Sequence, residues 1–156
     1  MGKIGIIQPG RLGDLIILLP AIKYYADRGS EVYWPVFDTY VDMFKEVVNY
    51  ANFIPISNDV YKCIPESYQK LKELNIENIK DIAFTFPGST ATEEYVKRGD
   101  GLEDPFDMIK YDMLDVPFDE KWNLNLNRNL EIENNLFNKL VKQPKYAVVN
   151  LKYSGG

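Results

Sequence analysis

A three-layer α/β fold with a mainly parallel sheet is predicted from the order of elements along the chain. Short apolar runs rich in β-branched residues alternate with amphipathic segments of helical period, in the order strand, helix, strand, helix, strand, helix, strand. Parallel strands need such crossover connections, which are right-handed in almost all proteins. The chain has 156 residues, 46% of them hydrophobic, which suffices for one domain with a buried core. The sequence therefore predicts a Rossmann-like domain.

Three strand–helix pairs fill the first half of the chain. The strands are expected where β-branched and aromatic residues gather, at Lys3–Gln8, Glu31–Phe37 and Asn52–Ile56. Pro55 cannot donate a hydrogen bond to a ladder, so the third strand is expected at a sheet edge. The segments between and after these strands carry apolar residues at helical spacing. They predict helices over Leu15–Arg28, Tyr40–Tyr50 and residues 61–75. We expect Gly29 to close the first of these helices and Asp38 or Thr39 to cap the second.

The second half continues with a fourth strand, further helices and a final strand. The apolar run Asp81–Phe86 predicts the fourth strand, and the Pro-Gly-Ser that follows it predicts a turn. Helical spacing predicts helices over Thr90–Lys97, Phe106–Leu114 and residues 130–142, the last with its apolar side chains turned inward, namely Leu130, Leu136, Phe137 and Leu140. A last strand is expected at Tyr146–Leu151, before a glycine-rich ending.

The charge of the chain argues against nucleic acid as a partner. The net charge is −5, whereas a nucleic-acid binder usually presents a basic face to the phosphates. Residues 99–120 hold eight acidic side chains and a single basic one, Lys110. We interpret this stretch as a solvated connecting segment.

Cysteine and histidine usage narrows the chemistry further. The single cysteine, Cys63, excludes a disulfide within the chain and fits a reducing compartment, so a cytoplasmic location is expected. The chain has no histidine, which excludes Ser-His-Asp and Cys-His catalysis. Acid–base chemistry near neutral pH must then use carboxylates, tyrosine, lysine or groups of a partner. The apolar run at residues 15–22 is too short to span a bilayer, although peripheral contact with a membrane surface stays open.

A short motif, Gly-Arg-Leu-Gly-Asp, follows the first strand at residues 10–14. Its glycines are spaced G-x-x-G, so it is not a dinucleotide-binding fingerprint. Asp14 precedes an apolar helical segment, and aspartate is a preferred N-cap residue, so the pattern predicts that Asp14 caps the helix. A carboxylate held by N-terminal amides has a lowered pKa, which would make it a weak base.

The sequence from this motif onward resembles a known family. An Arg11-Leu12-Gly13-Asp14 turn after the first strand, then an apolar helix with Leu19-Pro20-Ala21, is similar to the start of glycosyltransferase family 9, the lipopolysaccharide heptosyltransferases. The resemblance implies the N-terminal half of a two-domain GT-B fold, with residues 1–143 as the acceptor-side domain and 144–156 as the start of a second domain that is missing or truncated. Ile17 departs from the family, which commonly has a histidine there.

The resemblance also implies roles for individual residues. Asp14 would be the general base that takes the proton of an acceptor hydroxyl during inverting sugar transfer, without a metal ion or another cofactor. Arg11 either binds an anionic acceptor or is a solvated loop residue, and Ser89 and Thr90 either contact a ligand or cap a helix. The residues expected at the substrate are Gly10, Arg11, Leu12, Gly13, Ser89 and Thr90, and those expected on the diphosphate side are Ser154 and Gly155.

The expected function is therefore acceptor binding in a heptosyltransferase-like enzyme that uses a nucleotide-sugar donor and a saccharide or glycolipid acceptor. The chain by itself would be incomplete, because the resemblance places most of the donor site in the second domain. Two alternatives stay open: a stand-alone binding or scaffold module without enzymatic activity, and a Rossmann-like enzyme that binds a nucleotide by itself. An unpaired strand at 146–151 would favour self-association, so a homo-oligomer is expected.

Overall fold

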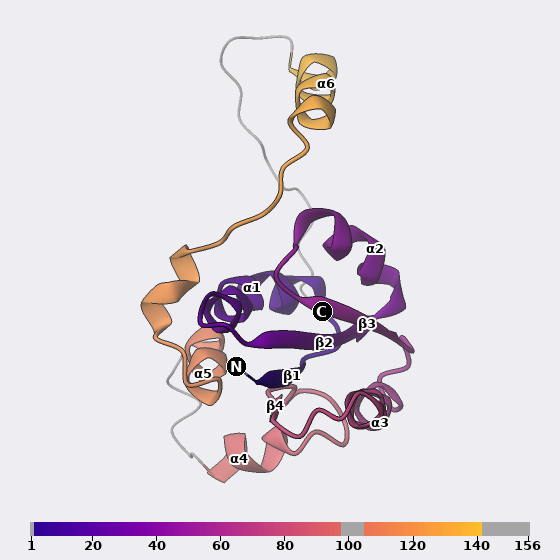
Figure 1. Ribbon diagram of the computed structural model, residues 1–156, viewed down its shortest axis with the longest axis vertical. Helices are drawn as coiled ribbons and strands as arrows, with labels where there is room; N and C mark the ends of the chain where they lie inside the picture. The colour runs from indigo at the N-terminus through magenta and orange to yellow at the C-terminus, as the bar shows by residue number, and fades with distance from the viewer. Residues whose placement is uncertain (1, 98–104, 142–156) are drawn as a thin grey trace.

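A four-stranded parallel sheet forms the centre of the molecule (Figure 1). The computed structural model describes residues 2–97 and 105–141. The strands are β1 (Lys3–Ile7), β2 (Glu31–Phe37), β3 (Asn52–Ile56) and β4 (Ile79–Asp81), in the spatial order β3-β2-β1-β4. The predicted α/β class and parallel sheet are confirmed, and β3 with its Pro55 lies at the expected edge.

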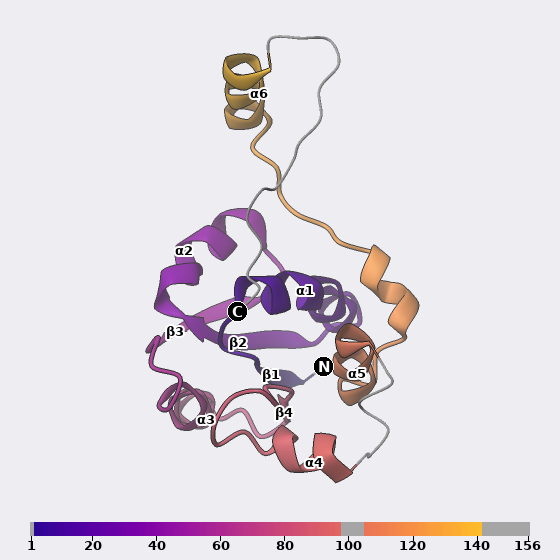
Figure 2. The same cartoon turned by 180° about the vertical axis from the view of Figure 1, so that it is seen from behind.

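Helices cover both faces of this sheet, as a three-layer fold requires (Figures 1 and 2). Helices α1 and α2 lie over one face and α3 lies over the other. The helices are α1 (Leu12–Asp27), α2 (Asp38–Val47), α3 (Cys63–Glu73), α4 (Ala91–Lys97), α5 (Phe106–Met113) and α6 (Leu130–Leu140), and a 3-10 turn, η1 (Phe118–Trp122), follows α5. Gly29 has a φ of 83° just after α1, as predicted for the residue that closes this helix.

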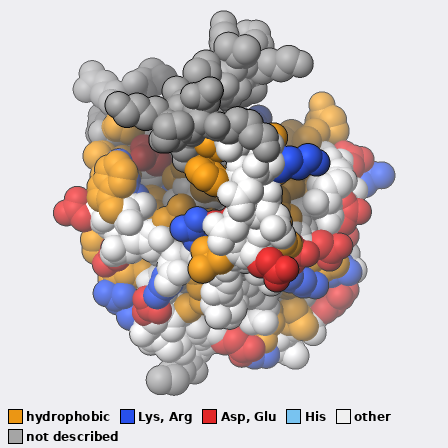
Figure 3. All heavy atoms as spheres, turned by 90° about the horizontal axis from the view of Figure 1, so that it is seen from above, with side chains coloured by type: hydrophobic (Ala, Val, Ile, Leu, Met, Phe, Trp, Pro, Cys, Tyr) orange, Lys and Arg blue, Asp and Glu red, His pale blue; other side chains and the backbone are white. Residues whose placement is uncertain are grey.

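Two hydrophobic clusters, one on each face, hold the layers together. Alternate side chains of the strands enter opposite clusters: Ile4 and Ile6 of β1 face the α1 side, whereas Ile7 faces the α3 side. In β2, Trp34 is fully buried in the first cluster between Phe44 of α2 and Phe53 of β3. On the face of the molecule seen from above, acidic and basic side chains are interspersed with hydrophobic ones (Figure 3).

The fourth strand is shorter and earlier than predicted. It ends at Asp81, where the Asp81 carboxylate accepts the backbone N–H of Ala83 at 3.0 Å and turns the chain out of the ladder. The apolar residues that suggested a strand are nevertheless buried on both faces, because Phe84 packs in one cluster and Ala83 and Phe86 pack in the other. The apolar run therefore reflects burial on both faces of the sheet and not hydrogen bonding within a strand.

Three further predictions about helices are wrong. Neither Asp38 nor Thr39 caps α2, since the N-cap residue is Phe37 and makes no side-chain cap bond. The acidic stretch is more than a solvated connection, because α5 within it buries apolar residues and its one base, Lys110. Helix α6 stands away from the sheet (Figure 1), and the side chains expected to point inward are exposed: Leu130, Leu136, Phe137 and Leu140.

Some predictions fall on residues outside the described part of the chain. These are the final strand at 146–151, with the self-association expected from it, the domain boundary near residue 143, and the diphosphate-side residues Ser154 and Gly155. Among the described residues, no helix is long and apolar enough to cross a membrane.

Candidate functional site

The site lies at the carboxyl ends of β1 and β4, where the order of the sheet reverses. Along the chain the first three strands run β1, β2, β3 toward one edge, and β4 then joins β1 from the other side. In open α/β sheets this switch point leaves a crevice beyond the strand ends, where ligands bind. The Gly-Arg-Leu-Gly-Asp motif leaves β1 at this point.

Helix α1 begins three residues earlier than predicted, which changes the role of Asp14. The N-cap residue is Arg11, with a φ of 62°, and Asp14 lies within the first helical turn. The prediction that Asp14 caps the helix is therefore wrong. The positive φ at Arg11 turns the chain sharply from strand to helix, so that the helix starts directly over the strand end.

The Asp14 carboxyl group is only partly exposed and has an unused oxygen. Its Oδ2 atom is buried and has no hydrogen-bond partner among the residues that the structure describes. Burial raises the pKa of Asp14 above its usual value, and the positive charges of Lys110 and Arg11 oppose that rise. The lowered pKa expected of a capping aspartate is thus replaced by a raised one, which makes Asp14 a stronger base.

Lys110 is the residue of this site that the sequence did not reveal. Its side chain is fully buried, and its ammonium donates to Gln8 Oε1 and, at 3.4 Å, to the carbonyl oxygen of Ile82. Gln8 follows β1 and Ile82 follows β4, so Lys110 bridges the two strand ends at the switch point. Its ammonium also lies 4.6 Å from the centre of the Phe106 ring.

Burial disfavours the charged form of Lys110 and lowers its pKa to about 8, with the Asp14 carboxylate opposing the shift. Asp14 and Lys110 therefore each influence the ionisation of the other. The described residues show no hydrogen bond between them, because Oδ2 of Asp14 is unpartnered and the Lys110 ammonium is directed to Gln8 and Ile82. One signal was visible in the sequence: Lys110 is the only base in a strongly acidic stretch and lies within a predicted helix.

The remaining motif residues divide into packed and open positions. A side chain at Gly10 would collide with the Phe37 ring, because a Cβ there would lie 2.2 Å from Phe37 Cε2, so this glycine permits the expected close approach. Gly13 is different, since a Cβ there would meet no atom within 4 Å. Leu12 and Arg11 are exposed, and the Arg11 guanidinium lies 5.5 Å from the centre of the Phe86 ring.

Ser89 and Thr90 are held by Asp81 at the end of β4. The Ser89 hydroxyl donates to Asp81 Oδ1 at 2.7 Å, and the Thr90 backbone N–H donates to Asp81 Oδ2 at 2.8 Å. Ser89 Oγ also accepts the N–H of Ala91 at 3.2 Å, at the start of α4. These contacts favour the helix-capping interpretation of Ser89 over the ligand-binding one. Asp81, which organises the cluster, was not singled out from the sequence.

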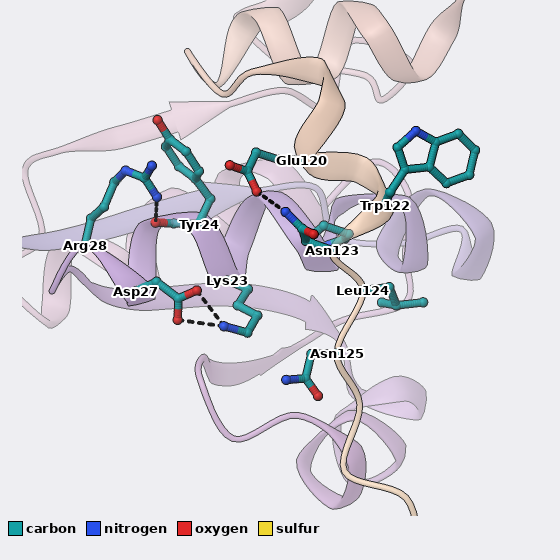
Figure 4. Close-up of a pocket in the computed structure, with 10 residues that line it drawn as sticks. Lys23, Tyr24, Asp27, Arg28, Glu120, Trp122, Asn123, Leu124 and Asn125 are labelled. Carbon is teal, nitrogen blue, oxygen red and sulfur yellow. Dashed lines mark hydrogen bonds and ion pairs between the residues drawn. The ribbon is translucent and has the colours of Figure 1, made fainter.

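A groove lies along the exposed side of α1, beyond the first turn that holds Asp14. Its larger cavity, of about 490 Å³, is bounded by α1, η1 and the segment after η1 (Figure 4). A second cavity of about 220 Å³ adjoins it and shares Pro20, Trp122 and Leu124. Among the described residues, no group of three or more acidic or cysteine side chains is placed to hold a metal ion.

Comparison of the chain with protein-family models, with curated proteins and with solved structures gave no match. The fold and the site define a Rossmann-like α/β domain with a carboxylate–lysine pair at its switch point.

The ionisation of Asp14 gives a direct test of this site. We expect its side-chain carboxyl carbon, followed by NMR during an acid titration, to report a pKa above 3.8. In a Lys110→Met variant the pKa should rise further, because an opposing positive charge is lost. The Asp14→Asn variant identifies the resonance. A pKa at or below 3.8, or a fall in the Lys110→Met variant, would contradict the arrangement described.

Proposed function

We propose that this chain is the acceptor-binding domain of a heptosyltransferase-like inverting glycosyltransferase, in which Asp14 is the general base. The observation that carries the proposal is the partly exposed Asp14 at the switch point of a parallel sheet, whose buried Oδ2 makes no hydrogen bond among the described residues. A general base must come within hydrogen-bond reach of the hydroxyl it deprotonates, so the Asp14 carboxylate must turn toward the acceptor when that binds. The motif residues that resemble the glycosyltransferase family place this carboxylate directly after the first strand.

The electrostatics of the site support the same role. Burial makes Asp14 more basic, while Lys110 and Arg11 favour the ionised carboxylate that a base must be before it accepts a proton. The open space at Gly13 leaves room beside the first turn of α1 for a bound molecule. Arg11, exposed at the helix start, is placed to contact an anionic group of the acceptor.

The proposed reaction balances with these groups. The acceptor oxygen forms a bond to the anomeric carbon of the donor sugar, and the bond from that carbon to the nucleoside diphosphate breaks. The diphosphate leaves with the electron pair, and the hydroxyl proton passes to Asp14. Attack opposite the leaving group inverts the anomeric carbon, through a transition state with oxocarbenium character. The groups that hold the donor would come from outside the described residues.

Acceptor binding can be measured on the chain by itself. The probe is a deacylated lipopolysaccharide inner-core oligosaccharide, whose carboxylate and phosphate groups suit Arg11. We expect it to shift the backbone amide NMR signals of residues 11–15. Arg11→Ala should weaken binding by about fivefold to tenfold through loss of a charge-assisted hydrogen bond. Arg128→Ala, which changes an exposed arginine paired with Glu133 near α6, is the matched control and should have no effect.

The Asp14→Asn variant separates binding from chemistry. It keeps the shape of the side chain, so oligosaccharide binding should change by no more than about twofold, whereas any transfer from a nucleotide-activated sugar should slow by about 10²-fold or more. Thermal stabilisation by nucleoside diphosphates, with no response to the oligosaccharide, would instead indicate a nucleotide-binding enzyme. A lack of response to both probes would leave the stand-alone module as the better description and would refute the proposal.

A further inference from the structure

The groove along α1 has two walls, each formed by ordered elements of the structure. One wall is α1 from Ile16 to Asp27, which spans about 17 Å at 1.5 Å per residue, together with Arg28 at its end. The other wall is η1 and the extended segment after it. That segment is fixed to α2 and the loop that follows, because the Asn127 N–H donates to the Val47 carbonyl at 2.7 Å and the Tyr50 hydroxyl donates to the Asn125 carbonyl at 3.1 Å.

Trp122 projects at the junction of the two cavities that make up this groove. Its side chain is 79% exposed, an unusual position for the largest apolar residue, and Figure 4 shows the indole standing clear of the helix. Lys121 lies 4.9 Å from the centre of the ring and is held by Asp107 at 3.5 Å. Leu124 and the Ile16–Ile17 pair continue the apolar surface on the Trp122 side.

Over the two cavities together, the charged side chains that line the groove carry no net charge. Its lining has three basic side chains (Lys23, Arg28, Lys121) and three acidic ones (Asp27, Glu120, Asp107). Lys23 is paired with Asp27 at 2.7 Å, and Arg28 lies over the Tyr24 ring at 3.2 Å. Asn123 and Asn125 add side-chain amides, of which that of Asn123 already donates to Glu120 Oε2 (Figure 4). An anionic lipid surface or a nucleic acid would need an excess of basic residues, which this lining lacks.

We propose that the groove binds a neutral oligosaccharide, with one sugar ring stacked on Trp122 and its hydroxyl groups hydrogen-bonded by the amides and paired charges of the larger cavity. A sugar ring presents apolar C–H faces together with an edge of hydroxyl groups. The groove offers the matching pair of surfaces, an open aromatic face beside a row of neutral or paired polar groups. This site does not depend on Asp14 acting as a base.

Tryptophan fluorescence makes the test selective, because the only other tryptophan, Trp34, is fully buried. The probes are maltohexaose, cellohexaose and mannohexaose. We expect at least one of them to shift the emission to the blue and to protect Trp122 from quenching by acrylamide. The Asp14→Asn variant should bind equally well, so loss of the proposed catalytic function would leave this result unchanged.

Variants at exposed aromatic residues supply the matched comparison. Isothermal titration of the oligosaccharide that responds should show about tenfold weaker binding for Trp122→Ala. Tyr61→Ala, which truncates a 74% exposed aromatic just before α3, should bind as the unaltered chain does. The inference is overturned if none of the three oligosaccharides protects Trp122, if Trp122→Ala binds normally, or if Trp122 is protected by phosphatidylglycerol vesicles and not by any oligosaccharide.

Discussion

Replacing Trp34 with alanine is expected to lower the free energy of unfolding by about 3–5 kcal/mol, the range found when a large buried aromatic is truncated. Trp34 is fully buried in β2, and its ring centre lies 5.8 Å from that of Phe53 and 6.4 Å from that of Phe44. Its indole N–H also donates to the Gln8 carbonyl oxygen at 3.0 Å. The alanine variant would leave both a cavity and an unpartnered carbonyl.

Urea denaturation followed by circular dichroism measures this loss. Trp122→Ala is the matched control, because it removes the same side chain from an exposed position and should change stability by no more than about 0.5 kcal/mol. Equal losses in the two variants would show that the core described around Trp34 is wrong. Since Gln8 also binds Lys110, the Trp34→Ala variant should disturb the switch point as well.

The second large effect is a dependence of stability on pH that comes from Lys110. Relative to a Lys110→Met variant, the unaltered protein should gain about 3 kcal/mol of stability between pH 7.5 and 10.5. In the folded chain, burial lowers the pKa of Lys110 to about 8, whereas a lysine in the unfolded chain titrates near 10.5. Between these values the unfolded state holds a proton that the folded state has released, so stability rises with pH.

The comparison must be made as a difference between the two proteins. Burial also raises the pKa of the Cys63 thiol to about 11 and that of the Tyr50 phenol to about 12, and such groups reduce stability as the pH rises above their ordinary values. These losses are common to both proteins and cancel. Urea midpoints across this pH range give the difference. A constant difference would mean that Lys110 ionises like an exposed lysine, and the burial of its ammonium at the switch point would have to be abandoned.

Both predictions concern the same place in the molecule. Lys110 and Trp34 reach Gln8 from different elements, one through the side-chain oxygen and one through the backbone oxygen. Gln8 is thereby fixed between β1 and the turn that presents Asp14. The stability of the core and the electrostatics of the proposed base are coupled through this residue, so stability should be measured for every variant used to test function.

The prediction from sequence succeeded where local pattern and tertiary burial coincide. β2 and β3 have the predicted ends, and Gly29 closes α1 as expected. Side-chain alternation in a strand and a positive φ after a helix depend only on residues that are neighbours in the sequence. It failed where the same residue pattern served another structure than the expected one. Asp81 ends β4 early by accepting the N–H of Ala83, two residues further on, and α6 has an amphipathic sequence whose apolar side chains the described structure leaves exposed.

The sequence by itself determined the parallel α/β class and the position of Asp14 just beyond the first strand, since both follow from the order and period of residues along the chain. Only the tertiary structure decided what surrounds Asp14. Lys110 lies 96 positions further along the chain, and the sheet order brings it to the switch point, where burial raises one pKa and lowers the other. The α1 groove with Trp122 likewise joins distant segments. The pKa of a group depends on the charges that lie near it in space, and the local sequence does not show how close distant residues come.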